Sequence, residues 1–232
     1  MKSEDVLILL SRLPSGSSCP LARVAISRVS NIQKPSGSAV KGIALVRAAD
    51  DAAFIVKSDC EATEVSAALL AAELGIAPEA WAGPDRSLIQ KFLPGRPLSR
   101  MFFPPCDAEQ LGSSLAMLLK TMHNAGLYYI DSVSRHLFLQ PEGGWRLIDF
   151  GAALLVTDPE APIVDVERWL RESTDSRARA AGCDGSVEDM AMLHDWLVWR
   201  NELRDSRLPL RSARYRSAAV DGFCQHYIRP FK

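Results

Sequence analysis

The hydrophobic pattern of the sequence changes at residues 94–97, and this change limits the possible folds more than any other feature. Before it, apolar residues run in short segments typical of strands, at residues 42–46, 53–56 and 86–93. A single helical pattern interrupts them at residues 64–74. After it, the spacing predicts a helix over residues 107–125 and mostly helix beyond residue 151. Strands followed by helices predict an α+β protein.

The break at residues 94–97 reads Pro-Gly-Arg-Pro, and proline and glycine interrupt both helical and strand patterns. We therefore expect a hinge there, with one lobe on each side. The first lobe, residues 1–93, should be rich in strands and carry one helix. The second lobe, residues 98–232, should be short and helical.

Composition excludes several classes of protein. The 232 residues carry a net charge of −1, so no overall positive field favours nucleic acid. The 24% charged and 47% hydrophobic residues are ordinary for a soluble globular protein. The five cysteines are scattered without a C-x-x-C pair, which favours reduced thiols in a cytoplasmic protein over disulfides or a zinc site.

The apolar run at residues 6–10 is too short to span a bilayer, and no cleavage site typical of a signal peptide follows it. We expect a first strand or a short helix that packs on the body of the protein. The alternative is an amphipathic segment that lies on a membrane surface.

Several features that can bind phosphate or metal occur in a fixed order along the chain. In sequence order they are a glycine-containing loop at residues 37–42, Lys57, Glu64, Asp131, and an Asp-Phe-Gly tripeptide that begins at Asp149. Lys57 ends one apolar segment, and Asp149 follows another. The loop has glycine at Gly37 and Gly42, and Ala39 stands between them.

This order resembles the protein-kinase-like superfamily, and the match covers about residues 37–156. Residues 73–78 and 89–95 are similar to the passage from helix to hinge in its small bacterial members. Residues 122–126, just before Asp131, are similar to the approach to the catalytic loop. The resemblance implies a two-lobed fold whose first lobe covers a nucleotide, with ATP as the phosphoryl donor.

The resemblance assigns the nucleotide-binding groups to the first lobe. Lys57 would hold the α- and β-phosphates, because phosphoryl transfer depends on positioning and on neutralising the phosphate oxygens. Glu64 would pair with Lys57 and orient it, and Glu61 is the rival partner on the same helix. The loop residues Gly37, Ala39 and Gly42 would cover the phosphates. Three consecutive residues just before the hinge, Lys91, Phe92 and Leu93, would bind the nucleotide.

The resemblance places the reacting hydroxyl and the metal in the second lobe. Asp149 would ligate Mg²⁺, since a hard dication prefers carboxylate oxygen. Asp131 would accept or orient the proton of the acceptor hydroxyl. His136 stands where most members have a metal-binding asparagine, so we expect it to serve the metal or a phosphate, with Mn²⁺ as an alternative ion.

The pattern of a histidine, His136, five residues after Asp131 resembles that of the bacterial lipopolysaccharide kinases that phosphorylate heptose or Kdo sugars. The implied acceptor is a sugar hydroxyl of an anionic glycolipid. Two alternatives stay open: a minimal bacterial protein Ser/Thr kinase, and a nucleotide-binding pseudokinase that acts as a scaffold. The segment after Gly151 has no Ala-Pro-Glu motif, which in protein kinases ends the peptide-docking region, and this favours a small acceptor.

Basic residues offer an acceptor surface. Candidates are Arg96, Arg100, Arg135 and the arginines of the C-terminal helix, including Arg211. The default reading of that basic tail is a solvated helix face. If the acceptor is an anionic glycolipid, the same arginines could hold the protein at the inner face of the inner membrane, so the expected location is cytoplasmic with peripheral membrane contact.

The remaining conspicuous side chains have structural interpretations. His123 and His194 lie in helical patterns, where we expect packing or capping. Trp169, Trp196 and Trp199 lie at helical spacing and should fill the core. We therefore assign none of these five side chains to catalysis.

Overall fold

The computed structural model describes residues 1–32, 42–101, 106–131, 134–141, 144–155, 187–205 and 212–227. The chain divides into two compact units, Met1–Leu93 and Pro94–Lys232. Within the described ranges, the first unit contains a five-stranded sheet, and the second contains three long helices and two small sheets. The prediction of an α+β protein is confirmed.

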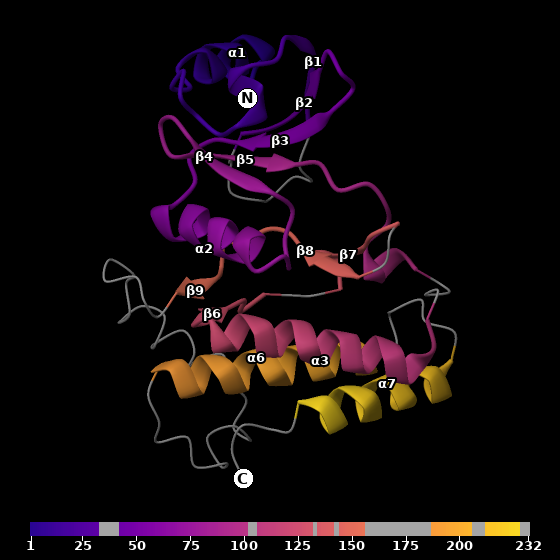
Figure 1. The fold of residues 1–232 in the computed structure, drawn as a ribbon. Coiled ribbons are helices and arrows are strands. Elements are labelled where there is room, and N and C mark those ends of the chain that lie inside the picture. Colours follow the sequence, from indigo (N-terminus) through magenta and orange to yellow (C-terminus); the bar gives the residue numbers. More distant parts are fainter. Residues whose placement is uncertain are drawn as a thin grey trace. The chain divides into compact units, whose positions relative to one another are not determined.

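The sheet of the first unit is antiparallel throughout, in the order β1-β2-β3-β5-β4 (Figure 1). Its strands are β1 (Ile26–Asn31), β2 (Ile43–Ala48), β3 (Ala53–Lys57), β4 (Ala80–Gly83) and β5 (Ser87–Lys91). The sequence pattern predicted β2, β3 and β5. It missed β1, which is mostly polar, and β4, which has only four residues and contains alanine and glycine.

Two α-helices lie on opposite faces of this sheet, α1 (Ser3–Ser11) and α2 (Ala62–Glu73) (Figure 1). The expectation of one helix in the first part of the chain is therefore wrong. The run at residues 6–10 forms part of α1 because Val6, Leu9 and Leu10 share one helical face. That face is buried in a core that also contains residues from β2, β3 and β5. A short 3-10 helix, η1 (Pro20–Ala22), follows α1.

The second unit is built on three helices, α3 (Ala108–Asn124), α6 (Val187–Arg204) and α7 (Ala213–His226). The predicted helix over residues 107–125 is confirmed as α3, and Asp107 caps it by accepting the N–H of Gln110 at 2.7 Å. Helices α3 and α7 run side by side (Figure 1). They approach closely at Gly112, where a Cβ atom would lie 2.0 Å from the carbonyl oxygen of Ala219.

Two small two-stranded sheets belong to the second unit. Strand β6 (Leu127–Tyr128) pairs with β9 (Leu154–Leu155), and β7 (Leu137–Leu139) pairs with β8 (Trp145–Leu147). The 3-10 helix η2 (Leu98–Arg100) precedes them. The described part beyond residue 151 is not all helix, since β9 follows directly, and residues 156–186 lie outside the described ranges.

The expected core side chains are buried where they are described. Trp196 and Trp199 are buried in the second unit, as are His123 and His194, whereas Trp169 lies outside the described residues. Among the described residues, no helix combines the length and the apolar character that crossing a membrane requires.

Candidate functional site

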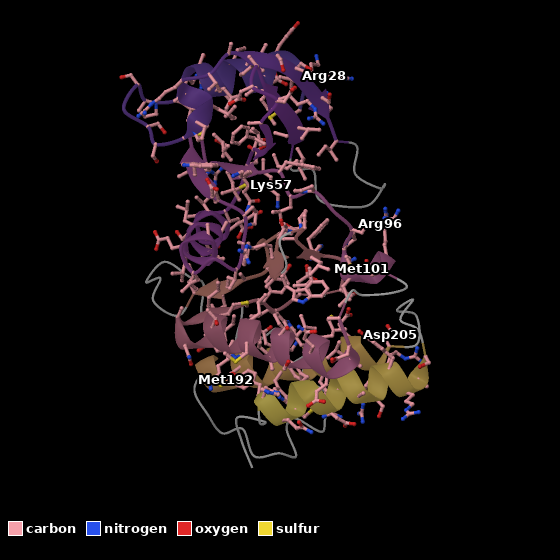
Figure 2. The ribbon with its side chains drawn as sticks, turned by 45° about the vertical axis from the view of Figure 1, so that its right-hand side comes forward. Arg28, Lys57, Arg96, Met101, Met192 and Asp205 are labelled. Carbon is pink, nitrogen blue, oxygen red and sulfur yellow. The ribbon has the colours of Figure 1, made fainter. Side chains whose placement is uncertain are left out.

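The first unit buries an ion pair between Lys57, the last residue of β3, and Glu64 in the first turn of α2. The Nζ–Oε1 distance is 3.3 Å, and the side chains are 10% and 1% exposed. A buried carboxylate without a cationic partner is strongly unfavourable, so the two side chains depend on each other. Figure 2 labels Lys57 within the first unit.

The geometry distinguishes Glu64 from its rival Glu61. Glu61 is the N-cap residue of α2, it is exposed, and its side chain makes no capping hydrogen bond. Glu64 lies one turn further along the helix, on the buried side. The carboxylate also lies in the first turn, where the helix dipole favours negative charge. The ammonium group of Lys57 is thus held at a defined position at the end of a rigid strand.

The expected phosphate-covering loop is described only at its end. Gly37 and Ala39 lie outside the described residues. At Gly42, a Cβ atom would lie 2.7 Å from the Cβ of Met1 and 2.7 Å from the Oγ of Ser58. This residue is therefore required by close packing within the first unit, which is a structural reason for glycine that needs no ligand.

The three residues that end the first unit, Lys91, Phe92 and Leu93, have main-chain groups that a ligand can use. The N–H of Lys91 donates to Glu79 O at 2.9 Å, and the N–H of Phe92 donates to Ala53 O at 2.8 Å. Among the described residues, we find no hydrogen bond from the N–H of the next residue, Leu93, and none to the carbonyl oxygen of Lys91. The side chain of Lys91 is instead in an exposed pair with Glu79, which contributes little to stability.

In the second unit, strand pairing brings His136 next to Asp149. His136 directly precedes β7, and Asp149 lies two residues after β8. The two strands are antiparallel with Leu137 opposite Leu147, and the N–H of Ile148 donates to His136 O at 3.0 Å. The hairpin therefore fixes the backbone positions of both functional side chains.

The imidazole of His136 lies between the two aspartates. Its Nδ1 is 3.4 Å from Oδ2 of Asp131, and its Nε2 is 3.8 Å from Oδ2 of Asp149. The guanidinium of Arg135, which is largely exposed, is 3.5 Å from Oδ1 of Asp131. Asp131, His136 and Asp149 are each partly exposed, so a ligand can reach the group.

One residue of this group and one residue next to it have backbone conformations that L-amino acids rarely adopt. Asp149 has φ of 66° and Ile130, directly before Asp131, has φ of 57°. Left-handed φ is especially unfavourable for a β-branched residue such as isoleucine, and each such residue costs about 1–3 kcal/mol. The surrounding structure must therefore hold Ile130 in place.

The residue that holds it is Asp195 of α6, which is completely buried. Its carboxylate accepts the N–H of Ile130 at 2.7 Å and the N–H of Tyr129 at 2.7 Å. Hydrogen bonds to a charged acceptor contribute about 1.5–3 kcal/mol, which is enough to offset the strain at Ile130. A second link from α6 joins the carboxylate of Glu202 to the N–H of Ser134 at 3.2 Å.

Tyr129 connects the loop before Asp131 to the segment that carries Asp149. Its hydroxyl donates to Ile148 O at 2.6 Å, and its ring meets Phe150 edge-on with centroids 5.6 Å apart. Burial raises the pKa of the Tyr129 hydroxyl well above its usual range, and the nearby carboxylates of Asp149 and Asp131 raise it further. The hydroxyl thus stays protonated and remains a donor.

A divalent metal fits two of these side chains only with help from a ligand. The oxygen of Asp149 suits Mg²⁺ or Mn²⁺, and the imidazole of His136 suits Mn²⁺ better. Among the described residues, no three His, Cys, Asp or Glu side chains form a group that could hold a metal by themselves. Proteins often bind Mg²⁺ through one or two carboxylates together with substrate phosphates.

No protein-family model matches the chain, and a search of curated proteins finds no match either. The functional interpretation therefore depends on the residues and their geometry.

The structure brings together most of the residues that the sequence singled out. Lys57 and Glu64 meet in the first unit, and Asp131, His136 and Asp149 meet in the second. Sequence reasoning missed Asp195 completely. The only signal available was a charged residue at a position of α6 flanked by His194 and Trp196, both of which are buried.

Proposed function

We propose that this chain is an ATP-dependent phosphotransferase of the protein-kinase-like superfamily, and that its acceptor is a sugar hydroxyl of the lipopolysaccharide inner core. The observation that carries the proposal is the group formed by Asp131, His136 and Asp149, in which one imidazole contacts both carboxylates. The buried Lys57–Glu64 pair supports it independently, because a fixed ammonium group suits a nucleotide phosphate.

In the proposed reaction, the oxygen of the acceptor hydroxyl forms a bond to the γ-phosphorus of ATP. The bond from that phosphorus to the oxygen bridging it to the β-phosphate breaks, and ADP leaves. Asp131 accepts the proton of the hydroxyl. Lys57, oriented by Glu64, holds the α- and β-phosphates. The carbonyl of Lys91 and the N–H of Leu93 hydrogen-bond the edge of the adenine.

Asp149 and His136 would hold the divalent ion. A bound Mg²⁺ or Mn²⁺ would neutralise charge on the phosphate oxygens. The left-handed backbone at Asp149 supports this role, since strained backbone is commonly maintained at functional sites.

The sugar acceptor is supported by His136 and by exposed basic residues in the second unit. Arg135 lies beside Asp131, and Arg96 and Arg100 are exposed just after the break between the units (Figure 2 labels Arg96). Such residues suit an anionic glycolipid and would permit contact with the inner face of the inner membrane. Arg211 lies outside the described residues.

The test is to incubate the purified protein with γ-labelled ATP and Mg²⁺ or Mn²⁺, together with core lipopolysaccharide or with general protein substrates. We expect label on the glycolipid, and at least about 100-fold less with Lys57→Ala or Asp149→Ala. Label on protein serines instead would favour the protein-kinase alternative. Binding of ATP without any transfer would favour the pseudokinase alternative.

A thermal-shift measurement separates binding from catalysis. A ligand that binds only the folded state raises the melting temperature, so Mg-ATP should stabilise the wild type and stabilise Asp149→Ala less. If no nucleotide with any divalent ion changes the melting temperature, the proposal is wrong.

A further inference from the structure

Tyr227, the residue directly after α7, is tied to the second unit at both its main chain and its side chain. The Nε1–H of Trp196 donates to Tyr227 O at 2.9 Å. The Tyr227 hydroxyl lies 2.5 Å from Nδ1 of His123, and the two rings pack with centroids 5.6 Å apart. The C-terminal end of α7 is thereby joined to the end of α3, which carries His123.

The other ring nitrogen of His123 continues this connection inward. Nε2 lies 3.1 Å from Oδ2 of Asp195, and the two side chains are 2% and 0% exposed. Asp195 in turn accepts the N–H groups of Tyr129 and Ile130. An unbroken path of hydrogen bonds therefore leads from the Tyr227 hydroxyl to the residue before Asp131.

The direction of each hydrogen bond follows from the groups involved. The backbone N–H groups can only donate, so the Asp195 carboxylate is the acceptor at the inner end. His123 faces the Tyr227 hydroxyl through Nδ1 and the Asp195 carboxylate through Nε2, so the tautomer with its proton on Nε2 and an accepting Nδ1 satisfies both contacts. Burial raises the pKa of the Tyr227 hydroxyl, with smaller contributions from Asp195 and Tyr128, so this group keeps the proton that it donates to Nδ1.

We propose that Tyr227 is a positioning residue, whose hydroxyl selects the tautomer and ring orientation of His123. This keeps the Asp195 carboxylate on the N–H groups of Tyr129 and Ile130, and the held Ile130 directs Asp131. Removal of the hydroxyl would leave the buried Nδ1 of His123 without this donor. The proton of the imidazole would then be free to move from Nε2 to Nδ1, or the ring to turn. In either case a ring nitrogen without a proton would face the Asp195 carboxylate. The significance for catalysis rests on the proposed phosphotransfer, but the mechanical link to the loop does not.

The test compares Tyr227→Phe with Tyr215→Phe. Both residues belong to the α7 region, both changes remove one hydroxyl with almost no change in volume, and both lose a hydrogen bond. The Tyr215 hydroxyl donates to Cys106 O at 3.0 Å, a partner outside the path through His123 and Asp195, so it serves as the matched control. Neither change should prevent folding.

The first measurement is amide hydrogen exchange of Tyr129 and Ile130, followed by NMR, which needs no enzymatic activity. We expect both amides to exchange about tenfold faster in Tyr227→Phe and at the wild-type rate in Tyr215→Phe. If Tyr227→Phe leaves the exchange unchanged, or if the two variants accelerate it equally, the positioning role is wrong.

The second measurement is steady-state kinetics of the full-length protein. Tyr227→Phe should lower kcat about tenfold with KM for ATP within about twofold, because the base is misplaced while the nucleotide-binding groups are intact. Tyr215→Phe should keep the wild-type kcat. An active enzyme whose kcat is the same in all three proteins would overturn the inference. If the wild type transfers no phosphate, the proposed function fails, and amide exchange still decides whether Tyr227 holds the loop.

Discussion

The carboxylate of Asp195 accepts the N–H of Ile130 at 2.7 Å, and Ile130 holds a left-handed φ of 57°. A buried acceptor on a helix thus stabilises a backbone conformation that isoleucine would otherwise avoid. Because Asp131 follows Ile130 directly, this contact between residues 65 positions apart in sequence helps to set the direction of the Asp131 side chain.

Asp195→Asn should destabilise the protein and distort the loop before Asp131. The asparagine side chain has one acceptor and one NH₂ group, so one of the backbone N–H groups would face a donor. We expect the free energy of unfolding to fall by about 3 kcal/mol, as measured by chemical denaturation. Asp221→Asn on the exposed side of α7 is the control and should change it by less than about 0.5 kcal/mol. Equal effects of the two changes would contradict the anchoring role.

Glu64→Gln should lower both stability and activity, because it leaves the ammonium group of Lys57 buried without its carboxylate. Breaking a buried ion pair costs about 3 kcal/mol, which a denaturation curve can measure. Phosphotransfer should fall in parallel. Glu61→Gln, at the exposed N-cap of the same helix, should leave both quantities close to wild type. A larger effect at Glu61 would reverse the assignment of the ion pair.

His136→Ala should lower phosphotransfer by about tenfold or more, because the imidazole contacts both aspartates. His136→Asn should restore part of the rate if the side chain serves the metal or a phosphate. Mn²⁺ should support the wild type at least as well as Mg²⁺, since imidazole suits Mn²⁺ better. Rates are measured with each ion in turn. Full activity of His136→Ala with a strict requirement for Mg²⁺ would remove this residue from the site.

Arg135→Glu should raise KM for an anionic glycolipid and leave the affinity for ATP nearly unchanged. The guanidinium is 63% exposed and lies beside Asp131, so it can meet an acceptor whose hydroxyl reaches that carboxylate. The same KM should rise with salt, because exposed charges are screened. Lys120→Glu, exposed on α3, makes the same change in net charge and should have no effect on KM. Indifference of the glycolipid KM to Arg135→Glu would argue against a basic acceptor site.

Gly112→Ala should destabilise the second unit by forcing α3 and α7 apart. The added Cβ would lie 2.0 Å from Ala219 O and 2.6 Å from the backbone nitrogen of Phe223, so the helix backbones must move. We expect a loss of about 3 kcal/mol in a denaturation experiment. Gly16→Ala, where a Cβ would meet nothing within 4 Å, is the control and should be nearly neutral. A neutral Gly112→Ala would show that the close approach of these helices is not required.

Local patterns in the sequence were sufficient to predict the elements that bury one regular face. The strands β2, β3 and β5 and the helices α2 and α3 follow from apolar spacing. The same rules failed for β1, a mostly polar strand that buries little apolar surface. They also could not decide between strand and helix for residues 6–10, which belong to α1. Periodicity is a property of neighbouring residues, and these segments are too short or too polar to show it.

The sequence by itself singled out Lys57, Asp131, His136 and Asp149 as candidates, because their order along the chain resembles the protein-kinase-like superfamily. Tertiary structure alone decided what holds them. It paired Lys57 with Glu64 and not with Glu61, and it placed Asp195 beneath the loop that ends at Asp131. These contacts join residues from different elements, and their strength comes from burial, which removes the competition of water for each charge and each N–H. No local pattern encodes burial of that kind, since it arises only when distant segments pack together.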